Sequence, residues 1–456
     1  MDAPAILLKG GTLVTMDRAR PDEFVGDLLI RDDLIAEIGT SIEPPPGANV
    51  IDVTGSIVIP GLVDTHRHSW QALLRFAGVD WTIPQYGPAM FGNYGPRFTA
   101  NDMYLSLRVA LAEAVDSGIT QLLDWNHNLT NPAHVEATVR AHLDSGMRVV
   151  FGYGESPTAW LGTYSAAHHG EPDDYLQRVR AFREHGFPDA GGRLTLAMAV
   201  RGPEKSPLEV VEAQWRTARD LGIRLSVHVG NGPNGRQRAV AGLSDAGLLG
   251  DDTTYIHCST IADDEIAMIA DSGGTASVAP VVEANMGHGP LALGRLIAAG
   301  VPASLSVDTC ANAGGDLFGA MRAAVMITRS QDHQEHLERG EWAAGVSLPV
   351  KDALALATIG GARANGLTES TGSLTVGKQA DVVVLSTRQP NMFPTNSAIG
   401  AVVAGAHPGN VDSVFVGGRA LKRNGRLLDD PEQLRVQASA AAARLMSGEL
   451  PNGAKS

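Results

Sequence analysis

Residues 60–68 read Pro-Gly-Leu-Val-Asp-Thr-His-Arg-His and follow the apolar run Ser-Ile-Val-Ile of residues 56–59. The run predicts a β-strand, and alternation along an extended chain puts the side chains of His66 and His68 on the same side. Two imidazoles in this arrangement can bind one metal ion. A His-x-His pair that stands alone is in most cases two histidines that only cap a strand, so the rest of the chain must supply further ligands.

The middle of the chain, from about residue 57 to about residue 366, alternates strand and helix patterns, which is typical of a parallel sheet. The candidate strands are 56–63, 119–124, 148–153, 194–200, 224–229, 253–257, 275–279 and 303–307. Helical patterns between them include 102–117, 134–146, 208–221, 263–272 and 291–299. Strands at this spacing predict a closed α/β barrel of roughly 250 residues, in which chemistry lies where strands end and loops begin.

Both ends of the chain have short, closely spaced strand patterns. Near the N-terminus these are 5–8, 11–15, 27–30, 34–38 and 50–53, and far downstream 372–385 and 411–419 have the same character. Strands this short and close predict one small β domain built from both termini. We therefore predict a discontinuous β-sandwich from 1–56 and 367–430, a barrel from 57–366, and a C-terminal helix and tail from 431–456 that packs on a surface or a subunit.

Composition narrows the class of protein. The chain has 456 residues, of which 19% are charged, and no like-charge run, which predicts an ordered globular protein. Its net charge of -14 argues against a nucleic-acid surface, since phosphate binding needs clustered Lys and Arg. Cys258 and Cys310 lack the spacing of a zinc knuckle, which favours a reducing, cytoplasmic location. No apolar run has membrane-spanning length, so we expect no membrane association.

Polar side chains follow four of the predicted barrel strands at their carboxyl ends. They are His66 and His68 after strand one, His228 after strand five, His257 after strand six and Asp308 after strand eight. Because the carboxyl ends of barrel strands form one rim, we expect these side chains to converge. Neutral imidazoles with one carboxylate suit zinc, with iron or manganese as alternatives, and a site open to water is catalytic.

These residues, together with the split β domain that contains Ala-Asp-Val-Val-Val-Leu at 380–385, resemble the amidohydrolase superfamily. The branch in question contains triazine hydrolases and guanine, cytosine and adenosylhomocysteine deaminases, and the resemblance covers nearly the whole chain. It implies a distorted (β/α)₈ barrel with a β-sandwich made from both termini, and a homodimer or higher homo-oligomer. The metal ligands that it implies are His66, His68, His228 and Asp308, with His257 binding the metal or orienting its water.

The same resemblance bears on the number of metal ions. Binuclear members of the superfamily use a carboxylated lysine on strand four, but residues 193–200, Arg-Leu-Thr-Leu-Ala-Met-Ala-Val, contain no lysine. We therefore expect one divalent ion, which lowers the pKa of bound water towards neutrality. Asp308 would take the proton and hand it to the leaving nitrogen, and His257 would polarise the substrate or steady the nucleophile.

One position departs from the family pattern. Deaminases and triazine hydrolases of this branch carry a glutamate about three residues after the strand-five histidine, which shuttles a proton to the ring nitrogen. Here residues 228–234 read His-Val-Gly-Asn-Gly-Pro-Asn, so Asn231 stands at that position, and an amide cannot shuttle a proton. Glu155 after strand three and Glu283 after strand seven are candidate replacements. This departure favours cleavage of an amide-like C–N bond, for which Asp308 alone can serve.

Residues 70–99 form a long segment rich in Trp, Tyr, Pro and Gly, which predicts a lid or a wall of the substrate site. Aromatic side chains there can stack on a planar substrate, and Arg201 after strand four can bind a carboxylate or a carbonyl. The candidate substrate-binding residues are Gln71, Trp81, Tyr86, His127, Arg201, Asn231, Glu283, Asn285 and His288.

The sequence thus predicts a metal-dependent hydrolase that cleaves a C–N bond of a small cyclic or heteroaromatic compound. One alternative is a deaminase of a purine, pyrimidine or triazine, and another is hydrolytic removal of a ring substituent such as halide. A non-catalytic barrel that only binds a ligand would be expected to lose a ligand histidine or Asp308, and all of them are present. The identity of the substrate depends on the loops around the site.

Overall fold

The computed structural model describes residues 5–155, 172–187 and 192–447. Its centre is an eight-stranded sheet in which every neighbouring pair of strands is parallel and the order in space follows the order in sequence. The strands are β6 (Leu62–Arg67), β7 (Ile119–Asn126), β8 (Arg148–Gly154), β9 (Leu194–Val200), β10 (Arg224–Val229), β11 (Thr253–His257), β12 (Thr275–Val278) and β13 (Ala303–Leu305). Most of their residues are buried, as parallel strands covered on both faces require. The predicted barrel is confirmed.

The barrel closes between its first and last strands at the level of Asp308. Asp308 and Arg67 form a parallel bridge, in which the Asp308 N–H donates to the His66 carbonyl (2.9 Å) and the His68 N–H donates to the Asp308 carbonyl (2.7 Å). Deeper in the barrel, the Thr65 hydroxyl hydrogen-bonds the hydroxyls of Ser277 (2.6 Å) and Ser304 (2.9 Å). The backbone that closes the barrel therefore also carries the predicted metal ligands.

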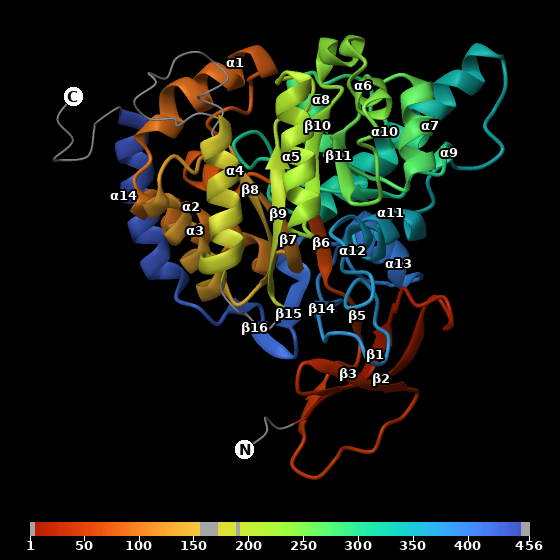
Figure 1. The fold of residues 1–456 in the computed structure, drawn as a ribbon. Coiled ribbons are helices and arrows are strands. Elements are labelled where there is room, and N and C mark those ends of the chain that lie inside the picture. The colour runs from red at the N-terminus through yellow and green to blue at the C-terminus, as the bar shows by residue number, and fades with distance from the viewer. Residues whose placement is uncertain (1–4, 156–171, 188–191, 448–456) are drawn as a thin grey trace.

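Helices cover the outside of the barrel (Figure 1). Those that follow barrel strands include α2 (Ala100–Asp116), α3 (Pro132–Ser145), α4 (Pro172–Ala181), α5 (Leu208–Asp220), α6 (Ala239–Asp245), α7 (Asp263–Ser272), α8 (Pro280–Met286), α9 (Leu293–Ala298) and α10 (Leu317–Glu338). The chain continues through α11 (Val350–Leu356), α12 (Ile359–Ala364) and the short α13 (Ala398–Gly400). The predicted helices 102–117, 134–146, 208–221, 263–272 and 291–299 all lie within a few residues of these bounds.

The second sheet is built from both ends of the chain. Its strands are β1 (Ile6–Leu13), β2 (Phe24–Arg31), β3 (Leu34–Gly39), β4 (Asn49–Asp52), β5 (Ser56–Pro60), β14 (Val382–Ser386), β15 (Val411–Val416), β16 (Arg419–Arg423) and β17 (Arg426–Leu427). The two ends meet where β14 pairs antiparallel with β5, and Figure 1 shows the blue C-terminal strands beside the red N-terminal ones. The predicted β structure from both termini is confirmed, whereas its exact domain boundaries stay a prediction.

The first predicted barrel strand, 56–63, is wrong in its extent. Residues 56–60 form β5, which pairs with β1 and β14 in the terminal sheet, and the barrel strand β6 begins only at Leu62. Gly61 lies between the two, where an added Cβ would come within 1.9 Å of Thr120 Oγ1. The chain can therefore pass from one sheet to the other at this point only because residue 61 has no side chain.

Residues 70–99 are not an irregular loop. They contain a 3₁₀ helix from Ser69 to Leu74, the short helix α1 (Ile83–Gly87), a π-helical turn from Pro88 to Tyr94 and a 3₁₀ turn from Gly95 to Arg97. At the other end of the chain, α14 (Pro431–Ser447) lies against α2, and Arg444 forms an ion pair with Asp102. The C-terminal helix, predicted to pack on a surface or a subunit, thus lies against the barrel helix α2. No helix in the described ranges has the length and apolarity needed to span a membrane.

Candidate metal centre and substrate cavity

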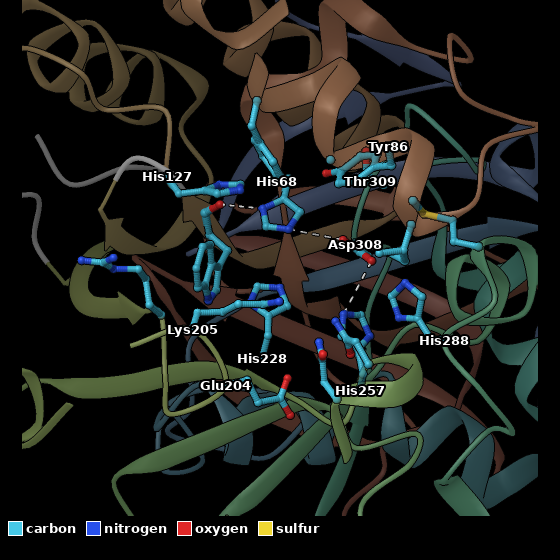
Figure 2. A pocket seen from close by; sticks show the side chains of 18 of the residues that line it. His68, Tyr86, His127, Glu204, Lys205, His228, His257, His288, Asp308 and Thr309 are labelled. Atoms are coloured by element: carbon cyan, nitrogen blue, oxygen red, sulfur yellow. Dashed lines mark hydrogen bonds and ion pairs between the residues drawn. The ribbon is translucent and has the colours of Figure 1, made fainter. Parts of the chain in front are cut away.

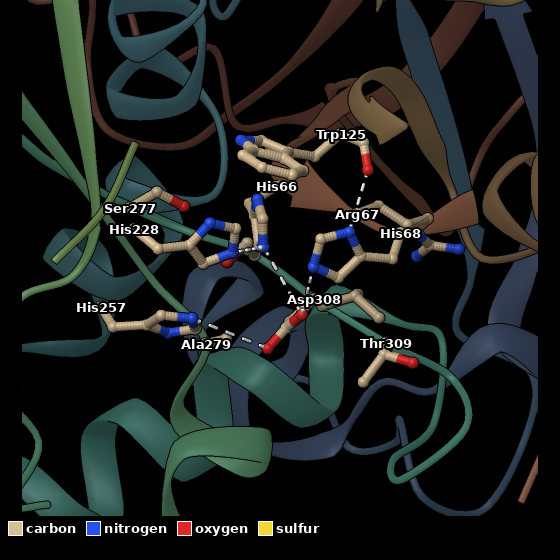
Figure 3. Close-up of polar contacts among 12 residues, drawn as sticks. His66, Arg67, His68, Trp125, His228, His257, Ser277, Ala279, Asp308 and Thr309 are labelled. Carbon is tan, nitrogen blue, oxygen red and sulfur yellow. Dashed lines mark hydrogen bonds and ion pairs between the residues drawn. The ribbon is translucent and has the colours of Figure 1, made fainter. Parts of the chain in front are cut away.

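Four histidines and Asp308 converge at the carboxyl end of the barrel (Figure 3). His66 lies at the centre, with its Nε2 atom 3.2 Å from His228 Nε2 and 3.4 Å from Asp308 Oδ1. His68 Nε2 lies 3.5 Å from the same carboxylate oxygen, and His257 Nε2 lies 3.9 Å from Asp308 Oδ2. The structure therefore brings together all five residues that the sequence placed at strand ends.

Two of these residues have unusual backbone conformations. His257 has φ 71° and Asp308 has φ 64°, in the left-handed region that non-glycine residues rarely adopt. Such a conformation costs about 1–3 kcal/mol per residue and persists only where the surrounding structure requires it. For Asp308, the two backbone hydrogen bonds that close the barrel hold the residue in this conformation. The strain is therefore located at the end of β11 and just beyond the end of β13, where the side chains turn towards the centre.

The protonation states of the histidines and of Asp308 favour binding of a cation. Burial lowers the pKa of His66 to about 3 and also lowers the pKa of His68 and His228, so these imidazoles are neutral. His68 donates from Nδ1 to the Trp125 carbonyl (2.9 Å), which leaves a lone pair on the Nε2 atom that faces Asp308. Burial alone would raise the pKa of Asp308, but the neighbouring histidines hold it well below its usual value, so the carboxylate is ionised.

This donor set fits a divalent metal ion. Two groups of side chains, His66 with His68 and His228, and His66 with His257 and Asp308, each place their ligand atoms within 4.8 Å of one another. The short approach of His66 Nε2 to His228 Nε2 brings two neutral nitrogens together. A cation that accepts both lone pairs satisfies such an arrangement, and imidazole with carboxylate is a ligand set of catalytic zinc sites.

His257 is held from behind by Glu283. Its Nδ1 atom donates to Glu283 Oε1 (2.9 Å), which also accepts the backbone N–H of Ala279 (2.7 Å). Burial lowers the pKa of His257, but the hydrogen bond and charge of Glu283 outweigh this effect and raise it overall. His288 stands edge-on to His257, with ring centroids 4.5 Å apart, and both of its buried ring nitrogens lack a hydrogen-bond partner.

A cavity of about 380 Å³ opens above the metal centre (Figure 2). Its apolar and aromatic lining consists of Ile83, Tyr86, Pro88, Phe91, Trp125 and Met286. Its polar lining includes His68, His127, Arg201, Glu204, Lys205, His228, Asn231, Asn234, His257, His288, Asp308 and Thr309. This size and this mixture of a broad apolar wall with a few polar groups are typical of a site for a small organic ligand.

The predicted substrate residues fall into two groups. Five of them line the cavity: Tyr86, His127, Arg201, Asn231 and His288. Gln71, Trp81, Glu283 and Asn285 are not among the lining residues. Gln71 is buried behind the wall, where its Nε2 donates to Tyr86 Oη (2.6 Å) and its Oε1 accepts from Thr309 Oγ1 (2.6 Å). Trp81 lies beside Gly78, and Asn285 is exposed on α8.

Glu155 and Glu283 were the candidate replacements for the glutamate expected at position 231. Both bind other side chains of the protein. Glu155 forms an ion pair with Arg201 (2.7 Å), and Glu283 is bound to His257. The carboxylates that line the cavity are instead Asp308 and Glu204. No motif pointed to Glu204, although it lies in the loop after β9, at the same rim as the other polar residues. Its position in the loop after a barrel strand is the one feature of the sequence that could have identified Glu204 as a site residue.

An eight-stranded parallel barrel with histidines and an aspartate converging at its carboxyl rim is the arrangement expected of a metal-dependent enzyme. The model of the amidohydrolase family matches residues 57–421, and the chain belongs to this family. It is a hydrolase that acts on carbon–nitrogen bonds.

Among characterised relatives, the chain is 27% identical to a 5'-deoxyadenosine deaminase from Methanothermobacter thermautotrophicus, over 98% of this chain and 100% of that protein. It is also 27% identical to a 5-methylthioadenosine/S-adenosylhomocysteine deaminase from Symbiobacterium thermophilum, over 97% of this chain and 99% of that protein. Both relatives therefore match this chain from end to end.

Solved structures share the fold. A triazine hydrolase from Arthrobacter aurescens superposes with a TM-score of 0.85 at 22% identity, covering 96% of this chain and 100% of that chain. An adenosine deaminase from Xanthomonas campestris with bound zinc superposes with a TM-score of 0.83 at 20% identity, covering 97% of this chain and 98% of that chain. The family match and the donor cluster of this chain together support a metal cofactor.

Proposed function

We propose that this chain hydrolyses the bond between a ring carbon and an exocyclic amino group of a small planar heterocycle. The observation that carries the proposal is the convergence of the histidines and Asp308 directly below a cavity with an aromatic wall. The names of the relatives support removal of an amino group, because both act as deaminases on adenosine derivatives. A cavity of about 380 Å³ has room for a purine, pyrimidine or triazine ring and a modest substituent.

In this proposal one divalent ion is the cofactor, zinc in the first place and iron or manganese as alternatives. The residues that would hold it are His66, His68, His228 and Asp308. When bound, such an ion lowers the pKa of water so that hydroxide is available near neutral pH. The absence of a lysine from β9 supports one ion rather than two.

The side chains around the ion would then transfer protons, donate hydrogen bonds and exclude water. Asp308 accepts a proton from the attacking water and passes it to the leaving nitrogen, since its carboxylate is ionised and points into the cavity. His257 donates from Nδ1 to Glu283, so a protonated His257 has a second N–H, at Nε2, to donate to the attacking oxygen. Tyr86, Phe91 and Trp125 would flank the ring and exclude water from it.

The test is a screen with protein stripped of metal and reloaded in parallel with zinc, iron or manganese. Substrates are aminopurines and their nucleosides, aminopyrimidines, aminotriazines, chlorotriazines and cyclic amides, with ammonia, chloride and ring absorbance followed together. We expect ammonia from at least one ring amine. Chloride release would instead support removal of a ring substituent, ring opening would support cleavage of a cyclic amide, and no product from any loaded form would contradict the proposal.

A pair of histidine variants controls this screen. His228→Ala removes an imidazole from the donor cluster, so we expect it to lose the metal and at least about 100-fold in activity. His333→Ala removes an exposed imidazole from α10 and should retain both metal and activity. Elemental analysis of both variants checks the first expectation independently of turnover, and metal retained at full stoichiometry in His228→Ala would contradict the assignment of this ligand.

Three further features belong to the proposal. The chain acts in the cytoplasm, which the two unpaired, buried cysteines support, and it assembles as a homodimer or higher homo-oligomer. Its domains divide as 1–56 with 367–430, 57–366 and 431–456. Size-exclusion chromatography with light scattering tests the assembly, and limited proteolysis tests the domain boundaries.

A further inference from the structure

Glu204 is the second carboxylate of the cavity, and the chemistry described above does not use it. It lies in the loop between β9 and α5, and its Oε1 atom accepts the backbone N–H of Gly230 (2.5 Å). Figure 2 shows it on the side of the cavity that carries His228 and His257, opposite Tyr86 and Thr309. The carboxyl group is therefore fixed beside the loop that follows β10.

The loop that binds Glu204 is tightly packed and holds its carboxyl group in place. Gly230 has φ +70°, and a Cβ at this residue would come within 2.8 Å of Ile261 Cγ2, so the loop is tightly packed where it binds the carboxylate. Within residues 5–155, 172–187 and 192–447, Gly230 is the only hydrogen-bond partner of Glu204. One carboxyl oxygen is thus anchored, and the other remains available to a molecule in the cavity.

Asn231 adds a second polar group at the same place. It follows Gly230 directly and lines the cavity, and its buried Oδ1 atom has no hydrogen-bond partner. A buried carbonyl oxygen without a partner costs about 1–3 kcal/mol, which a ligand that donates a hydrogen bond would offset. Glu204 and Asn231 together therefore present hydrogen-bonding groups to the cavity.

We propose that Glu204 is a catalytic residue that donates a proton to the ring nitrogen next to the attacked carbon, while Asn231 binds the same edge of the ring. This inference rests on the proposed function and extends it, because a ring nitrogen that accepts a proton is needed for loss of an exocyclic amine. The acid expected after β10 is thus supplied from the loop after β9.

The protons balance as follows. Water gives one proton to Asp308 and its oxygen bonds to the ring carbon, while Glu204 in its acid form protonates the neighbouring ring nitrogen as the carbon–nitrogen double bond becomes single. The amino group takes the proton from Asp308 and leaves as ammonia with the electron pair of the broken bond. The hydroxyl proton then passes to Glu204, which restores the acid and leaves a ring carbonyl beside a ring N–H.

The surroundings of Glu204 favour its acid form. Burial raises its pKa, whereas the hydrogen bond from Gly230 and the charges of Lys205 and His257 act against this effect, and Glu265 adds to it. A general acid works best when its pKa lies near the working pH. Because the acid form is needed, activity should fall as pH rises through the pKa of Glu204.

Glu204→Gln separates this role from a structural one, because the amide oxygen of Gln can still accept the Gly230 N–H but its side chain cannot transfer a proton. With the ring amine identified in the screen, we expect kcat to fall at least about 100-fold, the loss typical of a missing general acid. Metal content and thermal stability should be unchanged, and the alkaline limb of the rate profile should disappear. Glu209→Gln, an exposed position in the first turn of α5, is the matched control and should behave like the wild type.

The outcomes separate this inference from the function on which it rests. Wild-type protein that releases ammonia while Glu204→Gln keeps its kcat within about threefold would overturn the role of Glu204 and leave the proposed function intact. A loss of metal or of folding in Glu204→Gln would show a structural role and would also overturn it. Wild-type protein without turnover would overturn both.

Discussion

At the scale of single residues, the orientation of His257 depends on Glu283. This glutamate is buried, and its Oε1 atom accepts both from His257 Nδ1 and from the backbone N–H of Ala279. A partner of this kind determines which ring nitrogen carries a proton and how the ring is turned, and its loss typically costs 10- to 100-fold in activity or metal affinity at roughly comparable sites. The charge and the geometry of Glu283 can be tested separately.

We expect Glu283→Gln to lower kcat about tenfold, because the amide oxygen keeps both hydrogen bonds while the negative charge is lost. Glu283→Ala removes the acceptor as well and should cost about 100-fold, together with about 1–3 kcal/mol of stability. Steady-state kinetics and chemical denaturation measure the two effects. Equal kinetic losses in both variants would show that the charge alone matters.

Much of the candidate metal centre could be predicted because each of its residues lies at or just after the end of a barrel strand. His66, His228 and Asp308 follow apolar runs, and parallel strands bring such positions to one rim whatever lies between them in sequence. Residues on the intervening segments follow no such rule. Asn285 turns out to be exposed, while Glu204, in a loop of the same rim, lines the cavity.

At the scale of elements, helix α1 is connected to the metal centre through one buried side chain. Gln71 donates to Tyr86 at the end of α1 and accepts from Thr309, the residue after Asp308. Tyr86 and Thr309, the residue after the predicted metal ligand Asp308, are therefore held in register by two hydrogen bonds of 2.6 Å each. The sequence predicted that Gln71 binds substrate, but the packing shows that it lies behind the cavity wall.

Gln71→Met fills a similar volume but leaves Tyr86 and Thr309 without their partner. We expect KM to rise about five- to tenfold, or about 1 kcal/mol, because two hydrogen bonds that hold the cavity wall are lost, while kcat stays within about threefold. Gln437→Met on the exposed face of α14 is the matched control and should leave both constants unchanged. A fall in kcat with constant KM would instead place Gln71 in the chemical step.

At the scale of the whole molecule, a buried ion pair joins the barrel to the terminal sheet. Arg148, the first residue of β8, donates from Nε to Asp381 (2.9 Å), just before β14, and Asp381 also accepts the backbone N–H of Gly417 (2.8 Å). Both side chains are buried. The pair lies at the amino ends of the barrel strands, away from the catalytic rim, so it contributes to assembly of the fold rather than to chemistry.

Asp381→Ala leaves the Arg148 charge buried without its partner, and we expect a loss of about 3–5 kcal/mol in the free energy of unfolding. The fraction that remains folded should keep the wild-type kcat. Asp22→Ala breaks the exposed pair with Lys351 and should cost less than about 1 kcal/mol. Urea denaturation of the two variants compares them directly, and equal losses would contradict the role assigned to the buried pair.

The sequence by itself determined the barrel, the contribution of both termini to one sheet, and the convergence of the predicted metal ligands. These follow from local patterns, because strand alternation and the common direction of parallel strands place residues without further information. Tertiary structure alone decided where the first strand divides, at Gly61, and which carboxylate reaches the cavity beside Asn231. Both depend on close contacts between segments far apart in sequence, Gly61 with Thr120 and Glu204 with Gly230, which no local pattern encodes.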